Sequence, residues 1–175
     1  MYKQILGLVV CFVLAVAGVA QADDSWDKNV NSTTRFVLLG AFGNAAVKDK
    51  NTGLVWERSP DQTQRTWFEA SHYCWSRIVS GTYGWRLPKV EELKGVLDPL
   101  LPPPYVPTSA FSGVQPYYYW TITSDEQYLE INGYVKGALS ISLTPITVNN
   151  AVRSQGFANY SDIGNPFYAW CVRGE

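Results

Sequence analysis

Residues of the types that carry out chemistry are sparse in this sequence. His72 is the only histidine, so it is the candidate for a general base. A hydrolytic triad needs a nucleophile and an orienting acid that converge on such an imidazole. The chain has no Gly-x-Ser-x-Gly segment that would supply the nucleophile. We therefore expect His72 to be a surface residue and the protein not to be an enzyme.

Three acidic residues come closest to a cation site: Asp125, Glu126 and Glu130. A hard cation such as Ca²⁺ needs several oxygen ligands gathered at one point. An acidic loop in water explains the same spacing better than a cation site does, so we expect no metal and no other cofactor.

Cys74 and Cys171 are the two cysteines outside the apolar N-terminal run. In an oxidising compartment such a pair is expected to form one structural disulfide. The chain-entropy model gives so long a loop a stabilisation of roughly 4–5 kcal/mol. The alternative is a reactive thiol pair, but there is no Cys-x-x-Cys and no second histidine to activate a thiolate.

Arg86 lies in the segment GWRLP, shortly before a predicted helix whose first turn holds Glu91 and Glu92. A guanidinium can donate two parallel hydrogen bonds to one carboxylate. We predict that Arg86 and Glu92 are structural residues that fix this corner. Contact of Arg86 with a ligand is the alternative.

Four consecutive aromatic residues follow a proline-rich loop: Tyr117, Tyr118, Tyr119 and Trp120. Alternate side chains of a strand face opposite ways, so we expect two of these rings to be at least half-exposed. Exposed rings beside a loop would form a platform for sugar faces or peptides, and we take these four residues as the candidate ligand-binding face. The alternative is that they cover the core beneath the loop.

The N-terminus predicts export. Lys3, the apolar run that follows it and the segment Ala20-Gln21-Ala22 are typical of a secretory signal peptide at residues 1–22. An uncleaved N-terminal anchor is the alternative. After cleavage we expect a flexible lead-in at residues 23–34, one domain at residues 35–175 and no membrane span. The net charge of −1 and the lack of a basic stripe argue against nucleic acid as a partner.

Periodicity predicts the elements. Strands are expected at residues 35–39, 44–49, 54–56, 117–123, 138–143 and 167–172. The fifth is expected to have one wet face, because apolar and polar residues alternate along it.

Two helices are also predicted. Thr66 and Glu69 form a capping-box pattern, and Trp67, Ala70, Cys74 and Ile78 recur at helical spacing on one expected buried face. A second helix begins near Pro88 with Val90, Leu93 and Leu97 inward. The long loop at residues 101–116 is either functional or a linker. This order indicates an α+β fold.

The segments GLVWER, TWFEASHYC, YGWRLPKVEEL, YYYWTIT and WCVRGE occur in an order that resembles the Lcl C-terminal domain family. The resemblance covers roughly residues 35–175. It implies a C-type-lectin-like fold, with two helices packed on antiparallel strands and one disulfide, and it implies export. The fold it implies is related to that of formylglycine-generating enzymes, but the mature chain has no redox cysteines to spare for their chemistry.

In the adhesins that give the family its name, this domain sits on a collagen-like stalk and is associated with polysaccharide attachment. The resemblance therefore implies a non-catalytic binding domain, periplasmic or at the cell surface, for a polysaccharide or another envelope ligand. The alternative is a structural or assembly protein of the envelope that binds protein partners through the same face. This chain has no stalk, and nothing in it supports an oligomer. It also has Lys89 where the family usually has a helix-capping residue, so we expect a weaker helix start there.

Overall fold

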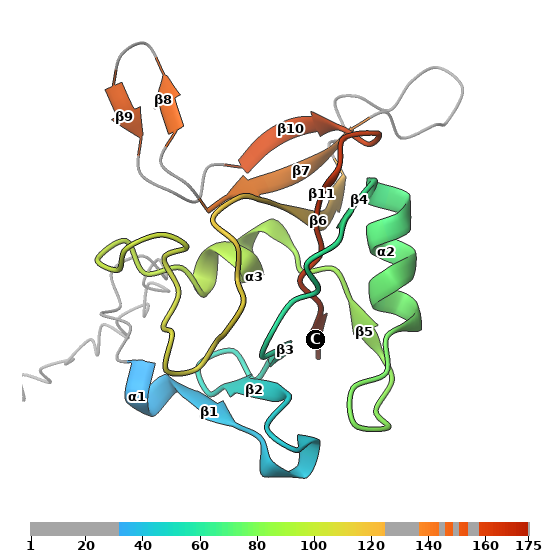
Figure 1. Cartoon of the computed structure of the whole chain (residues 1–175), viewed down its shortest axis with the longest axis vertical. Coiled ribbons are helices and arrows are strands. Elements are labelled where there is room, and N and C mark those ends of the chain that lie inside the picture. The colour runs from blue at the N-terminus through green and yellow to red at the C-terminus, as the bar shows by residue number, and fades with distance from the viewer. Residues whose placement is uncertain (1–31, 125–136, 144–145, 149–150, 154–157, 175) are drawn as a thin grey trace, which may run out of the picture.

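The computed structural model describes residues 32–124, 137–143, 146–148, 151–153 and 158–174 (Figure 1). The predicted signal peptide, most of the lead-in and the acidic residues Asp125, Glu126 and Glu130 lie outside these ranges. Within them, no helix has the length and apolar character needed to cross a bilayer.

The described part of the chain consists of short strands and a few helices, with all the helices in its first half. In chain order the elements are α1 (Ser32–Arg35), β1 (Phe36–Leu38), the 3-10 turn η1 (Gly40–Phe42), β2 (Ala46–Asp49), β3 (Val55–Glu57), β4 (Gln64–Arg65), α2 (Trp67–Ser76), β5 (Trp85–Arg86), α3 (Val90–Gly95), β6 (Tyr118–Ser124), β7 (Gly137–Ser142), β8 (Ile146–Val148), β9 (Ala151–Arg153), β10 (Ala158–Asp162), β11 (Phe167–Tyr168) and β12 (Val172–Arg173).

The described strands form two five-stranded sheets, in the orders β1-β2-β3-β12-β5 and β10-β7-β6-β11-β4, and a separate pair of β8 with β9. All pairings are antiparallel except that of β11 with β6. Figure 1 shows α3 between the sheet that holds β1 and β2 and the sheet that holds β6 and β7, while α2 flanks β4 and β5. The predicted α+β class with two main helices is confirmed.

The predicted hairpin in the first half of the chain is confirmed. Strands β2 and β3 pair antiparallel, with Val47 opposite Trp56. The first strand begins one residue later than predicted, because Arg35 ends the short helix α1. The guanidinium of Arg35 donates two hydrogen bonds, of 2.7 and 2.6 Å, to the buried carboxylate of Asp49 and so fastens α1 to the end of the hairpin.

Helix α2 begins as its capping pattern predicts. The backbone N–H of Thr66 has no acceptor within the helix backbone and donates to the carboxylate of Glu69 at 2.9 Å. Ala70 and Cys74 are fully buried as expected. The prediction for Ile78 is wrong: its side chain is 46% exposed. The helix ends at Ser76 and the next residue is extended, so the helical spacing no longer applies at position 78.

Helix α3 has a lysine at its N-cap, as the sequence predicts, and the side chain of Lys89 makes no capping hydrogen bond. The backbone N–H of Val90 instead donates to the hydroxyl of Thr123 in β6 at 3.1 Å. The carboxylate of Glu92 accepts the N–H of Lys89 at 2.7 Å. A distant strand therefore supplies the cap that the local sequence lacks.

The loop at residues 101–116 is part of the core. Tyr105, Val106 and Phe111 are buried, and the ring of Phe111 meets that of Trp170 edge-on at 5.0 Å. The loop is therefore not a linker, since its apolar side chains fill space beside α3 in the larger hydrophobic cluster.

The prediction of a wet face on the strand at residues 138–143 is wrong. Ser140 and Ser142 of β7, the strand between β6 and β10, are fully buried, so both faces of this strand are packed. The hydroxyl groups of Ser140 and Ser161 form a hydrogen bond of 3.0 Å, so both polar groups have a partner in the protein interior. The predicted closing strand is also divided, since β11 and β12 belong to different sheets.

The disulfide between Cys74 and Cys171 is present. It joins α2 to the residue before β12, with a Cα–Cα distance of 5.4 Å, and both cysteines are fully buried. It closes a separation of 97 residues and thus holds the helix against the C-terminal strands.

Candidate functional site

The aromatic stretch at residues 117–120 exposes fewer rings than a ligand face of four residues requires. Tyr117 is 41% exposed and Tyr118 is half-buried, whereas Tyr119 and Trp120 have no exposed surface. The assignment of Tyr119 and Trp120 to the ligand-binding face is therefore wrong, because a fully buried ring cannot stack on a ligand.

Both faces of β6 are covered, which explains this burial. On one face, the hydroxyl of Tyr119 accepts the N–H of Gln115 at 2.7 Å and its ring lies 5.5 Å from that of Tyr168. On the other face, the indole N–H of Trp120 donates to the carbonyl of Arg65 at 2.8 Å. The alternation of side chains along a strand predicts correctly that Tyr119 and Trp120 face opposite ways. It does not predict that other residues pack against both faces.

Four partly exposed rings remain together, and we call Tyr117, Tyr118, Phe167 and Tyr168 the aromatic cluster. Tyr118 stacks on Phe167 with ring centroids 5.0 Å apart and an interplanar angle of 24°. Tyr117 meets Tyr118 and Tyr168 edge-on at 5.5 and 5.9 Å. Sequence reasoning missed Phe167 and Tyr168, because it took that segment only as the strand that carries the second cysteine.

A second feature lies on the outer side of α2. A shallow depression of about 450 Å³, which we call the α2 depression, is lined by Arg65, Phe68, Glu69, His72, Tyr73 and Ser76. The ring of Phe68 is 58% exposed, so the depression offers an apolar surface to the solvent. Its volume falls within the range of small-molecule sites.

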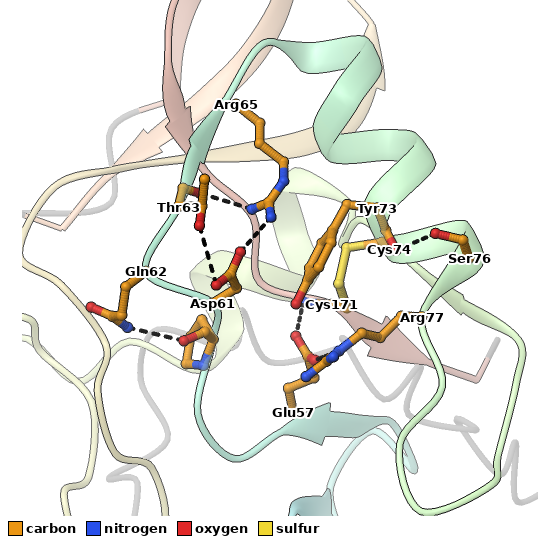
Figure 2. A network of polar contacts seen from close by, with 11 residues as sticks. Glu57, Asp61, Gln62, Thr63, Arg65, Tyr73, Cys74, Ser76, Arg77 and Cys171 are labelled. Atoms are coloured by element: carbon orange, nitrogen blue, oxygen red, sulfur yellow. Dashed lines mark hydrogen bonds and ion pairs between the residues drawn. A yellow bond between two sulfur atoms is a disulfide. The ribbon is translucent and has the colours of Figure 1, made fainter.

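The positive charge of the α2 depression is held in place from within the protein. The guanidinium of Arg65 lies 4.1 Å over the ring of Tyr73 and forms an ion pair with Asp61. Its Nη1 donates to the carbonyl of Thr63 at 2.9 Å. Figure 2 shows Tyr73 between Arg65 and Arg77. Burial, followed by the negative charge of Glu57, raises the pKa of Tyr73 to about 12, so its phenol keeps its proton at neutral pH.

The negative charge of the α2 depression is Glu69. Hydrogen bonds from the hydroxyl and the backbone N–H of Thr66, at 2.8 and 2.9 Å, lower the pKa of this exposed carboxyl. Glu69 is therefore ionised at neutral pH. It balances Arg65, so the lining carries both signs and no large net charge.

A buried carboxylate ties the C-terminal end of α2 to the disulfide. Glu57 in β3 accepts a hydrogen bond from the guanidinium of Arg77, and its other oxygen accepts the N–H of Cys171 at 3.2 Å (Figure 2). Burial raises the pKa of Glu57 although these two donors act against the rise. Together with the Cys74–Cys171 bond, this contact fixes α2 relative to β3 and β12.

The aromatic cluster and the α2 depression adjoin each other through Arg65. Strands β4 and β11 pair antiparallel with Arg65 opposite Phe167. Side chains of directly opposed residues project from the same face of a sheet. Phe167 belongs to the aromatic cluster and Arg65 to the α2 depression, so the two features follow one another across β6, β11 and β4 to α2.

The corner at Arg86 has the forked contact that the sequence suggests. Nη1 and Nη2 of Arg86 donate to the two carboxylate oxygens of Glu92 at 2.7 and 2.8 Å. Nη2 also donates to the carbonyl of Gly174 at 2.8 Å. This set of contacts holds β5, α3 and the C-terminal end of the chain together.

His72 is exposed on α2, and its nearest aromatic neighbour is the ring of Trp75 at 6.1 Å. Within the ranges that the structure describes, no group of three or more histidine, cysteine, aspartate or glutamate residues is placed to hold a metal ion.

Comparison with known proteins places this geometry in a family. A model of the Lcl C-terminal domain matches residues 45–173, a span that includes the aromatic cluster, the α2 depression and both disulfide cysteines. No curated protein and no solved structure matches the chain. Since the matched span is well over half of the sequence, the chain belongs to the Lcl C-terminal domain family.

Proposed function

We propose that this protein is an exported, non-catalytic binding domain that recognises a polysaccharide or another cell-envelope or extracellular ligand, in the manner of an adhesin. The observation that carries the proposal is the aromatic cluster, where Tyr118 and Phe167 stack at 5.0 Å beside the exposed Tyr117. The C–H faces of sugar rings are apolar, and partly exposed aromatic rings gain free energy when such a face covers them.

We infer a C-type-lectin-like arrangement for the fold. The chain pairs two main helices with two sheets, and its disulfide runs from the first long helix to the segment before the last strand. The sequence segments that resemble the family support the same inference. Such a fold presents loops and strand ends for binding and needs no catalytic group.

Export is supported by the N-terminal signal pattern together with the disulfide, because disulfides persist in oxidising compartments. Either the periplasm or the cell surface suits the proposal. The ligand is then a component that the protein meets outside the cytoplasm.

A glycan array with the oxidised domain, run in calcium and again in a chelator, tests the proposal. Binding to one or more glycans in both conditions is the expected result, because stacking and hydrogen bonds need no cation. Binding lost in the chelator would reassign the site to an ion. A blank array at high protein concentration would contradict polysaccharide recognition.

A second candidate function is a structural or assembly role with a protein partner. It is favoured by two exposed apolar side chains on and just after α2: Trp75 at 75% and Ile78 at 46%. Apolar side chains exposed in one region are typical of protein-binding surfaces. A partner whose capture is lost in Trp75→Ala, together with a blank array, would support this role over the first.

A further inference from the structure

We propose that the α2 depression is a second subsite, and that the ligand is an uncharged polysaccharide segment long enough to reach from the aromatic cluster to α2. This inference rests on the proposed function, because it names the class and length of the glycan bound by the same surface. It is carried by the juxtaposition of Arg65 and Phe167 and by the chemistry of the depression.

The aromatic cluster and the α2 depression form a continuous surface. Tyr118 stacks on Phe167 at 5.0 Å, Phe167 is opposite Arg65 in the β11–β4 pairing, and Arg65 lies 4.1 Å over the ring of Tyr73. Neighbouring strands are about 4.8 Å apart. A ligand that covers only the aromatic cluster would therefore end next to Arg65, at the rim of the α2 depression.

The α2 depression combines an apolar ring with polar groups. The ring of Phe68 is 58% exposed and offers an apolar surface for a sugar face. The described contacts of Arg65 use one N–H on Nη1 and one on Nη2, and a guanidinium has five such donors. The carboxylate of Glu69 can accept further hydrogen bonds from hydroxyl groups. An apolar ring beside a donor and an acceptor matches a sugar unit, which presents C–H faces and hydroxyl groups.

The charges around the α2 depression favour an uncharged ligand. Arg65 is paired with Asp61, and Glu69 is ionised, so an anionic polymer would meet two carboxylates for one guanidinium. No lysine lines the depression. A sulfated or uronic-acid polymer would gain little attraction there and would lose hydration of its charges. An uncharged chain meets no such cost.

The experiment measures affinity against ligand length. The probes are malto-, cello-, manno- and chito-oligosaccharides, each from the disaccharide to the hexasaccharide, with dextran sulfate as the charged polymer. The expected result is that at least one uncharged series binds, and that its hexamer binds at least about tenfold more tightly than its dimer, as a second stacking contact implies. Dextran sulfate is expected to bind more weakly than that hexamer.

The variants separate the two subsites. Phe68→Ala and His72→Ala change exposed residues of the α2 depression, so they are expected to keep the fold, which thermal unfolding checks. Phe68→Ala should weaken the hexamer about five- to tenfold and leave the dimer unchanged. Tyr118→Ala should weaken both ligands. Tyr83→Ala, an exposed ring that does not line the depression, is the matched control and should change neither.

The outcomes distinguish this inference from the proposed function. If the uncharged hexamer binds but Phe68→Ala and His72→Ala behave like Tyr83→Ala, the second subsite is wrong and glycan binding stands. If dextran sulfate binds and every uncharged series fails, polysaccharide binding stands and the uncharged ligand is wrong. If neither the uncharged oligomers nor dextran sulfate binds, the inference fails with the function on which it rests.

Discussion

The hydroxyl of Thr123 in β6 caps the backbone N–H of Val90 at the start of α3, at a distance of 3.1 Å. The residue at the N-cap itself, Lys89, has no side-chain oxygen that could accept this N–H. The helix start therefore depends on a strand more than thirty residues later in the sequence.

Thr123→Val should remove this cap while keeping a β-branched side chain of similar size. We expect a loss of about 1 kcal/mol in the free energy of unfolding, the usual cost of a lost helix cap. Urea unfolding followed by circular dichroism measures it. Thr123→Ser keeps the hydroxyl and should remain close to the wild type. Equal stability of the valine variant and the wild type would show that the contact contributes nothing.

Arg86→Lys should weaken the corner between β5 and α3. Lysine cannot reproduce the forked contact with both oxygens of Glu92, so we expect a loss of about 1–2 kcal/mol in unfolding free energy. A double-mutant cycle with Glu92→Gln isolates the pair. A coupling energy near zero in that cycle would contradict the account of this corner.

The same pair predicts a dependence on pH. Burial acts to raise the pKa of Glu92, but the hydrogen bonds from Arg86 and from the N–H of Lys89 outweigh it, so the pKa is lowered from its ordinary 4.5. A carboxyl group whose pKa is lower in the folded than in the unfolded protein stabilises the fold at pH values above its unfolded pKa. This stabilisation is lost as the pH falls through its folded pKa. The advantage of the wild type over Glu92→Gln should therefore shrink below about pH 4.5. An advantage that grows in acid would reverse this assignment.

Glu57 should behave in the opposite sense. Burial raises its pKa above 4.5, so in a window above that value the folded state holds a proton that the unfolded state has released. Stability due to this group therefore falls as the pH rises through the window. We expect the unfolding free energy of the wild type relative to Glu57→Gln to decrease from about pH 4 towards neutral pH. An increase over that range would mean that pairing with Arg77 outweighs burial.

Removal of the disulfide should be costly. The pair of substitutions Cys74→Ala and Cys171→Ala leaves a 97-residue separation unclosed, and we expect a loss of about 2–5 kcal/mol in guanidinium unfolding. The pair also holds α2 beside β12, so glycan binding should weaken along with stability. Unchanged unfolding in the double variant would rule out this role.

Local patterns predicted the parts of the fold that depend on neighbouring residues. The hairpin of β2 and β3, the cap of α2 at Thr66 and the stripe of α3 are set by residues a few positions apart. The cysteine pairing followed because only two cysteines lie outside the N-terminal run. Such features need no knowledge of the rest of the fold.

The errors concern contacts between distant residues. Ser140 is buried with its hydroxyl hydrogen-bonded to that of Ser161 in β10, and a period of two along one strand cannot reveal that partner. The ring of Trp120 is buried against Phe167 of β11, and its indole N–H donates to the carbonyl of Arg65 in β4. Phe167 also stacks on Tyr118. The candidate surface was therefore only half predicted: Tyr117 and Tyr118 were included, but their partners from β11 were not.

The central claim is that the aromatic cluster binds a glycan, and calorimetric titration of Tyr118→Ala against Tyr83→Ala tests it most directly. The ligand is the glycan that gives the strongest signal on the array with the wild-type domain. The account predicts that Tyr83→Ala binds like the wild type and that Tyr118→Ala, folded by circular dichroism, binds at least about tenfold more weakly. Equal affinity of the two variants would contradict it and remove the aromatic cluster as the binding site.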